Sequence, residues 1–179
     1  SYHVDYWNYL GWRDPFSSKA ATKRQKAYRW AMRTSMVYTP QMVIDGRYEG
    51  VGSQAGKIDR LIAKAGARAV LVTVALSRAG DILKASLSAM PKVGEADIWL
   101  VFYDKARTTR IASGENGGKT ITYRNVVRDF RVVGMYDGKE ATFNLPAKDS
   151  SGVKRWGAAV LVQKPNSGPI VGAAAVTGD

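Results

Sequence analysis

The stretch that most constrains the fold is residues 38–48, YTPQMVIDGRY. Thr39 precedes a proline, and a residue in that position avoids the helical region and adopts an extended backbone. Residues 41–44 (QMVI) then form a short, largely apolar run with strong β preference. Asp45-Gly46 is a hairpin signal, because a type I′ turn needs positive φ at both of its central positions. The stretch therefore predicts a turn, a strand and a tight hairpin in succession.

Helical patterns flank this stretch on both sides. Before it, Ser17 or Ser18 can cap a helix that runs to about Arg33. The expected buried face of that helix consists of Ala20, Ala27, Trp30 and Ala31. After it, Ser53 can cap a second helix that ends near Gly66. The apolar positions of this second helix recur at helical spacing and are Ile58, Leu61, Ile62 and Ala65.

Four blocks of the sequence resemble successive blocks of one protein family. They are HVDYW at 3–7, GWRDPF at 11–16, RQKAY at 24–28 and YTPQMVIDG at 38–46. The family is the thioredoxin-like domain-of-unknown-function family of secreted bacterial proteins, and the resemblance covers roughly the first 65 residues. It implies a thioredoxin-like domain in which proline, strand, hairpin and helix follow in this order, with a cis Thr39–Pro40 bond.

Members of that family usually begin with a strand, a Cys-x-x-Cys motif and a helix, and this chain has none of them. The chain contains no cysteine, so no redox residue can be carried over and residues 1–179 alone are expected to be redox-inert. Because the sequence starts at Ser rather than Met, we expect an N-terminal portion to precede it. The strand expected to end near Asp5 and the strand at 41–44 should then lie roughly 10 Å apart, with one strand position between them.

From residue 67 onwards the pattern changes to short β-like runs separated by Gly, Asp, Asn and Pro. The predicted strands cover 69–75, 82–89, 98–103, 107–112, 123–136, 141–145, 156–163 and 170–176. Asp137-Gly138 is a second hairpin signal, and Trp99 and Phe102 are expected to be mostly buried. Strands at this spacing predict an antiparallel β-sandwich.

The expected fold class is therefore α/β plus all-β, in two domains. Residues 1–66 are expected to form a thioredoxin-like half-domain that lacks its first strand and helix. Residues 67–179 are expected to form the β-sandwich that follows it.

The chain carries a formal net charge of +12, distributed evenly as +6 on residues 1–65 and +6 on residues 66–179. Nucleic-acid-binding proteins cluster basic residues on one face, so no specific nucleic-acid partner is expected. An anionic envelope surface is a weaker candidate partner. No apolar stretch reaches the ~18 residues of a transmembrane segment, and the family resemblance implies a periplasmic or secreted protein.

Two groups of residues are candidates for a substrate-binding site. The first is Thr39-Pro40, where the resemblance implies that the backbone beside the proline pairs with an extended peptide or protein substrate. The second is the aromatic loop that contains Tyr6, Trp7 and Trp12. Each has a structural alternative, since the proline could only shape its turn and the loop could only pack against the neighbouring domain. Trp7 and Trp12 are expected to be largely buried, because a fully solvated aromatic loop would be a sticky patch.

His3 and Asp5 are two residues apart on the expected first strand, so their side chains should share one face. This spacing fits either a metal pair or a His–Asp hydrogen bond. The chain has a single histidine, which excludes a metal site built from several imidazoles. No catalytic residue, metal or other cofactor is expected within the chain.

Two functions are compatible with the sequence. The first is that of a secreted or periplasmic thioredoxin-like protein, linked to thiol–disulfide chemistry through cysteines upstream of this chain. The alternative is a non-catalytic module that binds a peptide or a small ligand with the proline turn and the aromatic loop.

Overall fold

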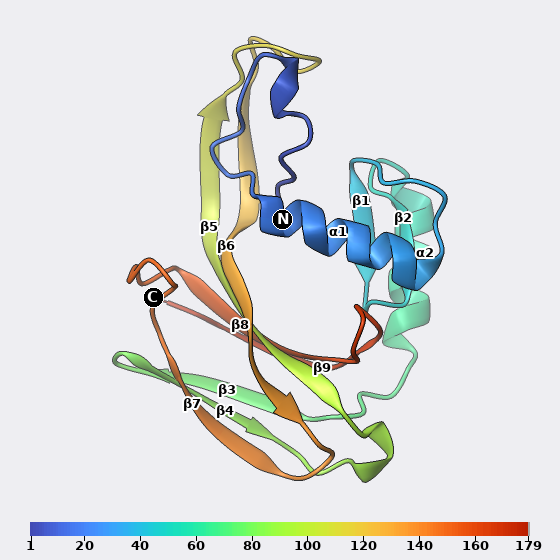
Figure 1. Cartoon of the computed structure of the whole chain (residues 1–179), viewed down its shortest axis with the longest axis vertical. Helices are drawn as coiled ribbons and strands as arrows, with labels where there is room; N and C mark the ends of the chain where they lie inside the picture. Colours follow the sequence, from blue (N-terminus) through green and yellow to red (C-terminus); the bar gives the residue numbers. More distant parts are fainter. Residues whose placement is uncertain (179) are drawn as a thin grey trace.

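The computed structural model of the chain describes residues 1–178 and is a mixed α/β structure dominated by antiparallel strands (Figure 1). The helices are η1 (Asn8–Leu10), α1 (Lys19–Met32), α2 (Ala55–Gly66) and η2 (Pro91–Val93). The strands are β1 (Gln41–Ile44), β2 (Tyr48–Val51), β3 (Val74–Ala79), β4 (Ile82–Leu87), β5 (Ala96–Arg110), β6 (Thr120–Tyr136), β7 (Ala141–Pro146), β8 (Gly157–Gln163) and β9 (Ile170–Thr177).

The predicted strand and hairpin after Pro40 are confirmed. β1 and β2 pair in antiparallel fashion, and the Arg47 amide donates to the Ile44 carbonyl at 3.0 Å. Asp45 and Gly46 have φ values of 51° and 61°, as a type I′ turn requires. The Thr39–Pro40 peptide bond is cis, also as predicted.

The two α-helices cover opposite faces of this hairpin (Figure 1). Gly50 faces α2, since a Cβ on it would lie 3.1 Å from the Ile58 side chain. Gln41 points to the other face and accepts a hydrogen bond from Gln25 of α1 at 3.2 Å. A helix thus lies over each face of the hairpin, and the strand edges are the parts of it that no helix covers.

The N-cap of α1 is Ser18, whose hydroxyl accepts from the Ala21 amide at 3.1 Å, so this predicted helix start is confirmed. The predicted buried face is wrong. Ala20 and Ala31 are exposed, Ala27 is only half-buried and Trp30 is 75% exposed. The buried residues are Ala21, Thr22, Arg24 and Tyr28. The prediction from apolarity failed because three of these four residues carry polar groups, and Thr22, Arg24 and Tyr28 find hydrogen-bond partners on the inner face.

The second predicted helix is present as α2, with a shifted start. Its N-cap is Gln54 rather than Ser53, and no side chain caps it. Ile58 and Ala65 are buried as expected, whereas Ile62 is exposed. Gly66 lies inside the helix instead of following it.

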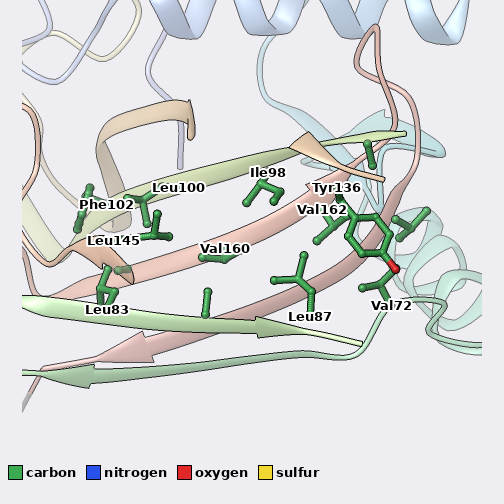
Figure 2. Close-up of a cluster of buried hydrophobic side chains, with 14 of the residues drawn as sticks. Val72, Leu83, Leu87, Ile98, Leu100, Phe102, Tyr136, Leu145, Val160 and Val162 are labelled. Carbon is green, nitrogen blue, oxygen red and sulfur yellow. The ribbon is translucent and has the colours of Figure 1, made fainter. Parts of the chain in front are cut away.

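Two sheets enclose one hydrophobic core in the rest of the chain. One sheet has the order β3-β4-β7 and the other the order β6-β5-β8-β9. Leu83 and Leu87 of the first sheet meet Phe102, Val160 and Val162 of the second in a fully buried cluster (Figure 2). This is the arrangement expected of an antiparallel sandwich. Phe102 is buried as predicted, and Trp99 is half-buried.

Several strand predictions need correction. The run 98–103 and residues 107–110 of the next run belong to one strand, β5, because β6 pairs with it along its length through two register shifts. The run 69–75 lies too early, since β3 spans Val74–Ala79. Asp137-Gly138 forms a turn but no hairpin, because β7 leaves the sheet of β6 and pairs with β4. Local turn chemistry does not determine which strand the chain joins next.

The expected strand before Asp5 is also absent. Within the described residues, Val4 makes a single bridge to Ser18 and the segment forms no ladder with β1. Ser1 instead lies against β6, where its carbonyl accepts from the Val127 amide at 2.9 Å. The N-terminal loop therefore runs along the β5–β6 hairpin (Figure 1). The proposed boundary between residues 66 and 67 stays a prediction.

One buried carboxylate, Asp149 in the loop between β7 and β8, makes the stability of the fold depend on pH at low pH. Asp149 is 6% exposed and accepts hydrogen bonds from Ser151, Val153 and Arg155. Burial alone would raise its pKa, but these donors outweigh it and lower the pKa from 3.8 to about 2. A carboxyl whose pKa is lower in the folded than in the unfolded protein stabilises the fold at any pH above the unfolded-state pKa. This stabilisation is lost as the pH falls through the folded-state pKa.

We therefore expect the free energy of unfolding to decrease as the pH falls from about 4 to about 2. Urea denaturation across this range measures it. Asp149→Asn should flatten the dependence, since the variant cannot titrate there. Asp81→Asn, at an exposed pair with Lys148, is the control and should change the slope much less, because exposed ion pairs contribute little to stability. Parallel curves for the wild type and Asp149→Asn would contradict this assignment.

Candidate functional site

β1 has one free edge. Its only strand partner within residues 1–178 is β2, and no backbone hydrogen bond from another segment reaches its outer side. Natural proteins protect exposed edges with charges, prolines or bulges. Gln41, Met42, Val43 and Ile44 provide none of these. A four-residue strand with both faces covered and one bare edge can accept another strand.

Exposed side chains collect at the start of this edge. The Trp7 indole nitrogen donates to the Thr39 hydroxyl at 3.1 Å, and the Trp7 side chain is 44% exposed. Thr39 and Pro40 are exposed, and Met42 is 41% exposed. We call Trp7, Thr39, Pro40 and Met42 the β1 rim. The structure thus brings together the proline turn and the aromatic loop, which are more than 30 residues apart in sequence.

A hydrogen-bond network holds this loop on the hairpin. The Tyr6 hydroxyl donates to Gln25 at 2.9 Å, and Gln25 donates to the Tyr38 carbonyl at 2.8 Å. On the same face, Gln41 and the Tyr38 hydroxyl donate to Glu49. Burial raises the pKa of Tyr38 to about 12, and the neighbouring Glu49 adds to the shift. Tyr38 therefore stays protonated near neutral pH, and the loop is fixed to β1 through side chains of α1.

The outcomes for the predicted aromatic residues differ. Tyr6 and Trp7 both lie near the proline turn. Their two ring centroids are 5.2 Å apart. The expectation that Trp7 is largely buried is wrong, because the indole stays 44% exposed even though its nitrogen donates to Thr39. Trp12 is half-buried, and within the described residues it makes none of the hydrogen bonds or ring contacts that join Tyr6, Trp7 and Thr39.

His3 pairs with a residue that the sequence pattern missed. Its Nδ1 lies 2.6 Å from Asp14 Oδ2. Asp5, the expected partner, instead accepts from the Thr22 hydroxyl at 2.6 Å. The prediction failed because residues 3–5 form no strand, so i and i+2 do not share a face. Within residues 1–178 no cluster of three or more His, Cys, Asp or Glu side chains is placed to hold a metal.

The fold and the β1 rim together define a mixed α/β protein with a free strand edge beside a proline turn. The chain matches the family model described as "Protein of unknown function (DUF1223)" over residues 1–163. It therefore belongs to the DUF1223 family. In the part of the chain that the structure describes, no helix is both long and apolar enough to cross a membrane.

The chain is similar to a protein of known crystal structure from Agrobacterium tumefaciens. The two share 38% identity with a TM-score of 0.84, covering 100% of this chain and 79% of the other. A hypothetical protein from Pyrococcus horikoshii matches at 14% identity with a TM-score of 0.25, over 60% of this chain and 84% of that one. No curated protein matches the chain.

Proposed function

We propose that this protein is a thioredoxin-like binding module of the periplasm or the secreted fraction, and that it takes up an extended polypeptide along the free edge of β1. The observation that carries the proposal is the unpaired edge of β1, which lies directly beside Trp7, Thr39 and Pro40. Strand addition of this kind uses main-chain hydrogen bonds for affinity and neighbouring pockets for side-chain selection.

The covered faces of the hairpin support this mode of binding. Because α1 and α2 already occupy both faces, a ligand can reach β1 only along its edge. The backbone groups there are fixed in extended geometry by β2. A peptide that adds to them loses its own conformational freedom but meets a strand that is already ordered.

The β1 rim supports a preference for apolar side chains in the ligand. Trp7 and Met42 offer apolar surface next to the edge, and tryptophan is among the residues that dominate binding energy in interfaces. The hydrogen bond to Thr39 fixes the indole, so little side-chain freedom is lost on binding. We expect a ligand that alternates β-branched or aromatic residues with polar ones.

Thiol–disulfide chemistry is the alternative that the family resemblance suggests. Residues 1–179 contain no cysteine, so this chemistry would need thiols from another segment or another protein. The same edge of β1 would then position the segment that carries them. Binding of an extended polypeptide at β1 is required by both proposed functions, so it is tested first.

The test uses two fluorescein-labelled peptides about eight residues long. One alternates Val, Ile or Tyr with Ser and Thr, and the other has the same length with consecutive prolines through its centre, so that every register places prolines against β1. Proline lacks the amide that a ladder requires, so only the first peptide should raise the fluorescence anisotropy. Equal binding of both peptides, or of neither, would refute strand addition.

Substitutions in the rim should weaken binding of the proline-free peptide. Trp7→Ala is expected to raise the Kd by about 30-fold, equivalent to about 2 kcal/mol. Met42→Ala should have a smaller effect in the same direction. Met135→Ala, at an exposed methionine on β6, is the matched control and should leave the Kd unchanged. An effect of Met135→Ala as large as that of Trp7→Ala would place the peptide elsewhere.

A further inference from the structure

The solvent-exposed side of α1 carries basic residues and a tryptophan in a single line. Lys19, Lys23, Lys26 and Trp30 follow one another at i, i+4, i+7 and i+11, which places them within an arc of about 60° on the helix surface. All four residues are exposed. We call these four residues the α1 stripe. It extends for about 16 Å along the helix axis, because each residue adds about 1.5 Å.

The structure separates the α1 stripe from the other basic residues of the helix. The stripe lies on the side of α1 opposite to Ala21, Arg24 and Tyr28, which the helix buries. Arg29 is held by the loop that follows the helix, since its Nη2 donates to the Ser35 carbonyl at 2.9 Å. The charge that remains free on α1 is therefore gathered on one side, although the charge of the whole chain is divided evenly between its two parts.

The segment that contains the α1 stripe has no acidic residue. Residues 15–44 contain six lysines and arginines but no Asp or Glu. In the described part of the chain, residues 1–178, no ion pair involves any lysine of the stripe. Arg33, the exposed C-cap residue of α1, adds a further cation at the end of the helix. This surface therefore attracts anionic groups, and the ammonium groups of the stripe can donate to them.

Trp30 lies among these cations and has a large apolar surface in contact with water. Its side chain is 75% exposed, the highest value among the five tryptophans of the chain. The guanidinium of Arg29 lies 5.2 Å from its ring centroid and supports the ring. Tryptophan favours the interface between water and a lipid bilayer, where the ring is apolar and the indole N–H can still form hydrogen bonds. A tryptophan flanked by lysines is thus suited to a surface that is both anionic and partly apolar.

We propose that α1 docks on the surface of an anionic phospholipid bilayer, with the lysines of the stripe at the lipid phosphates and Trp30 between the headgroups. α1 forms an outer layer over the β1–β2 hairpin (Figure 1), so it offers a straight, convex ridge to a flat surface. Binding sites for single-stranded nucleic acids instead combine a basic groove with several aromatic rings for successive bases. The stripe has one ring and no groove, which favours the bilayer.

The docking is peripheral and depends on salt. Each Lys or Arg near an anionic bilayer raises the partition coefficient by about five-fold, so the three lysines together contribute about 10²-fold. Salt screens this attraction within a Debye length. The binding does not involve the free edge of β1, so it is independent of the proposed uptake of a polypeptide there.

Co-sedimentation of the full chain with large unilamellar vesicles tests the proposal. One set of vesicles consists of phosphatidylcholine with about 30% phosphatidylglycerol, and the other of phosphatidylcholine alone. We expect the chain to bind only the anionic vesicles, and less so as NaCl rises from about 0.05 M to about 0.5 M. Equal binding to both sets of vesicles, or binding to neither, would overturn the proposal.

Two double variants with the same net charge test whether the stripe carries the binding. Lys23→Gln with Lys26→Gln should lower the partition coefficient for the anionic vesicles by about 25-fold. Lys84→Gln with Lys92→Gln, at exposed lysines outside α1, is the matched control and should lower it by less than about two-fold. Equal losses in the two double variants would show that net charge acts without the stripe, and would refute the assignment.

Trp30 gives a second, independent readout. Its fluorescence should shift to shorter wavelengths when anionic vesicles are added, and this shift should be absent in Trp30→Phe. Trp30→Ala should lower the partition coefficient by about five-fold, and its binding of the β1 peptide should be unchanged. An unchanged emission spectrum in the presence of bound vesicles, or tighter binding to a fluorescein-labelled oligothymidylate than to the anionic vesicles, would overturn the docking on lipid.

Discussion

Replacing Gly172 with alanine is expected to lower the free energy of unfolding by about 3 kcal/mol or more. A Cβ at this position of β9 would lie 2.3 Å from the Val72 carbonyl oxygen and 3.0 Å from the Val72 Cβ. The neighbouring Val171 carbonyl accepts from the Val72 amide at 2.9 Å, so the two segments cannot separate without losing that bond. Because the clash involves backbone rather than a flexible side chain, the sheet itself must shift. Urea denaturation of the two proteins measures the difference.

Gly56→Ala is the matched control for this substitution and should have the opposite sign. Gly56 lies in α2, and a Cβ there would meet nothing within 4 Å. Because Gly56 is the second residue of the helix, alanine there should stabilise by somewhat less than the ~1 kcal/mol that separates alanine from glycine in a helix interior. If Gly172→Ala costs less than about 1 kcal/mol, the close approach of β9 to Val72 does not exist in solution.

Replacing Arg24 with alanine is expected to cost about 3 kcal/mol. This residue of α1 is 8% exposed, and its guanidinium lies 4.6 Å from the centroid of Trp99 and 5.8 Å from that of Phe130. Its Nη2 donates to the buried Gln163 at 2.9 Å. Truncation would leave a cavity between α1 and the four-stranded sheet, and Gln163 would lose a donor.

Two further variants separate the causes of that loss. Arg24→Met fills the volume without the charge and should recover about half of the stability, because a buried cation carries a desolvation cost. Lys23→Ala, on the exposed face of α1, should change the stability by less than about 0.5 kcal/mol. The measurement is again urea denaturation. Equal effects of Arg24→Ala and Lys23→Ala would show that α1 does not dock through Arg24.

The sequence could predict features that depend on neighbouring residues. The hairpin at Asp45-Gly46, the cap at Ser18 and the strand at 82–89 follow from local turn chemistry, capping and β preference. The structure has the hairpin and the cap, and β4 spans Ile82–Leu87. It could not predict that the Asp137-Gly138 turn sends β7 to a different sheet, since this depends on pairing with the distant β4. Arg24 was missed for a similar reason, because its burial depends on rings from β5 and β6.

In the candidate site, too, local features could be predicted from the sequence, and features that depend on distant residues could not. Thr39, Pro40 and Trp7 could be singled out from the sequence, and the structure places Trp7 on Thr39. Their exposure was not predictable, because it depends on where the N-terminal loop lies relative to β1. The pairing of His3 with Asp14 joins residues 11 positions apart through a loop, and no periodicity indicates such a contact.

Amide hydrogen exchange on residues 41–44 tests the central claim most directly. In the free chain, amides of β1 that face β2 should be protected, and those on the free edge should exchange fast. Addition of the proline-free Val/Ile/Tyr peptide should slow the exchange of the free-edge amides and leave that of β4 unchanged. Strong protection of every amide of residues 42–44 in the free chain, or peptide binding with no change in β1, would contradict the claim that this edge accepts a strand.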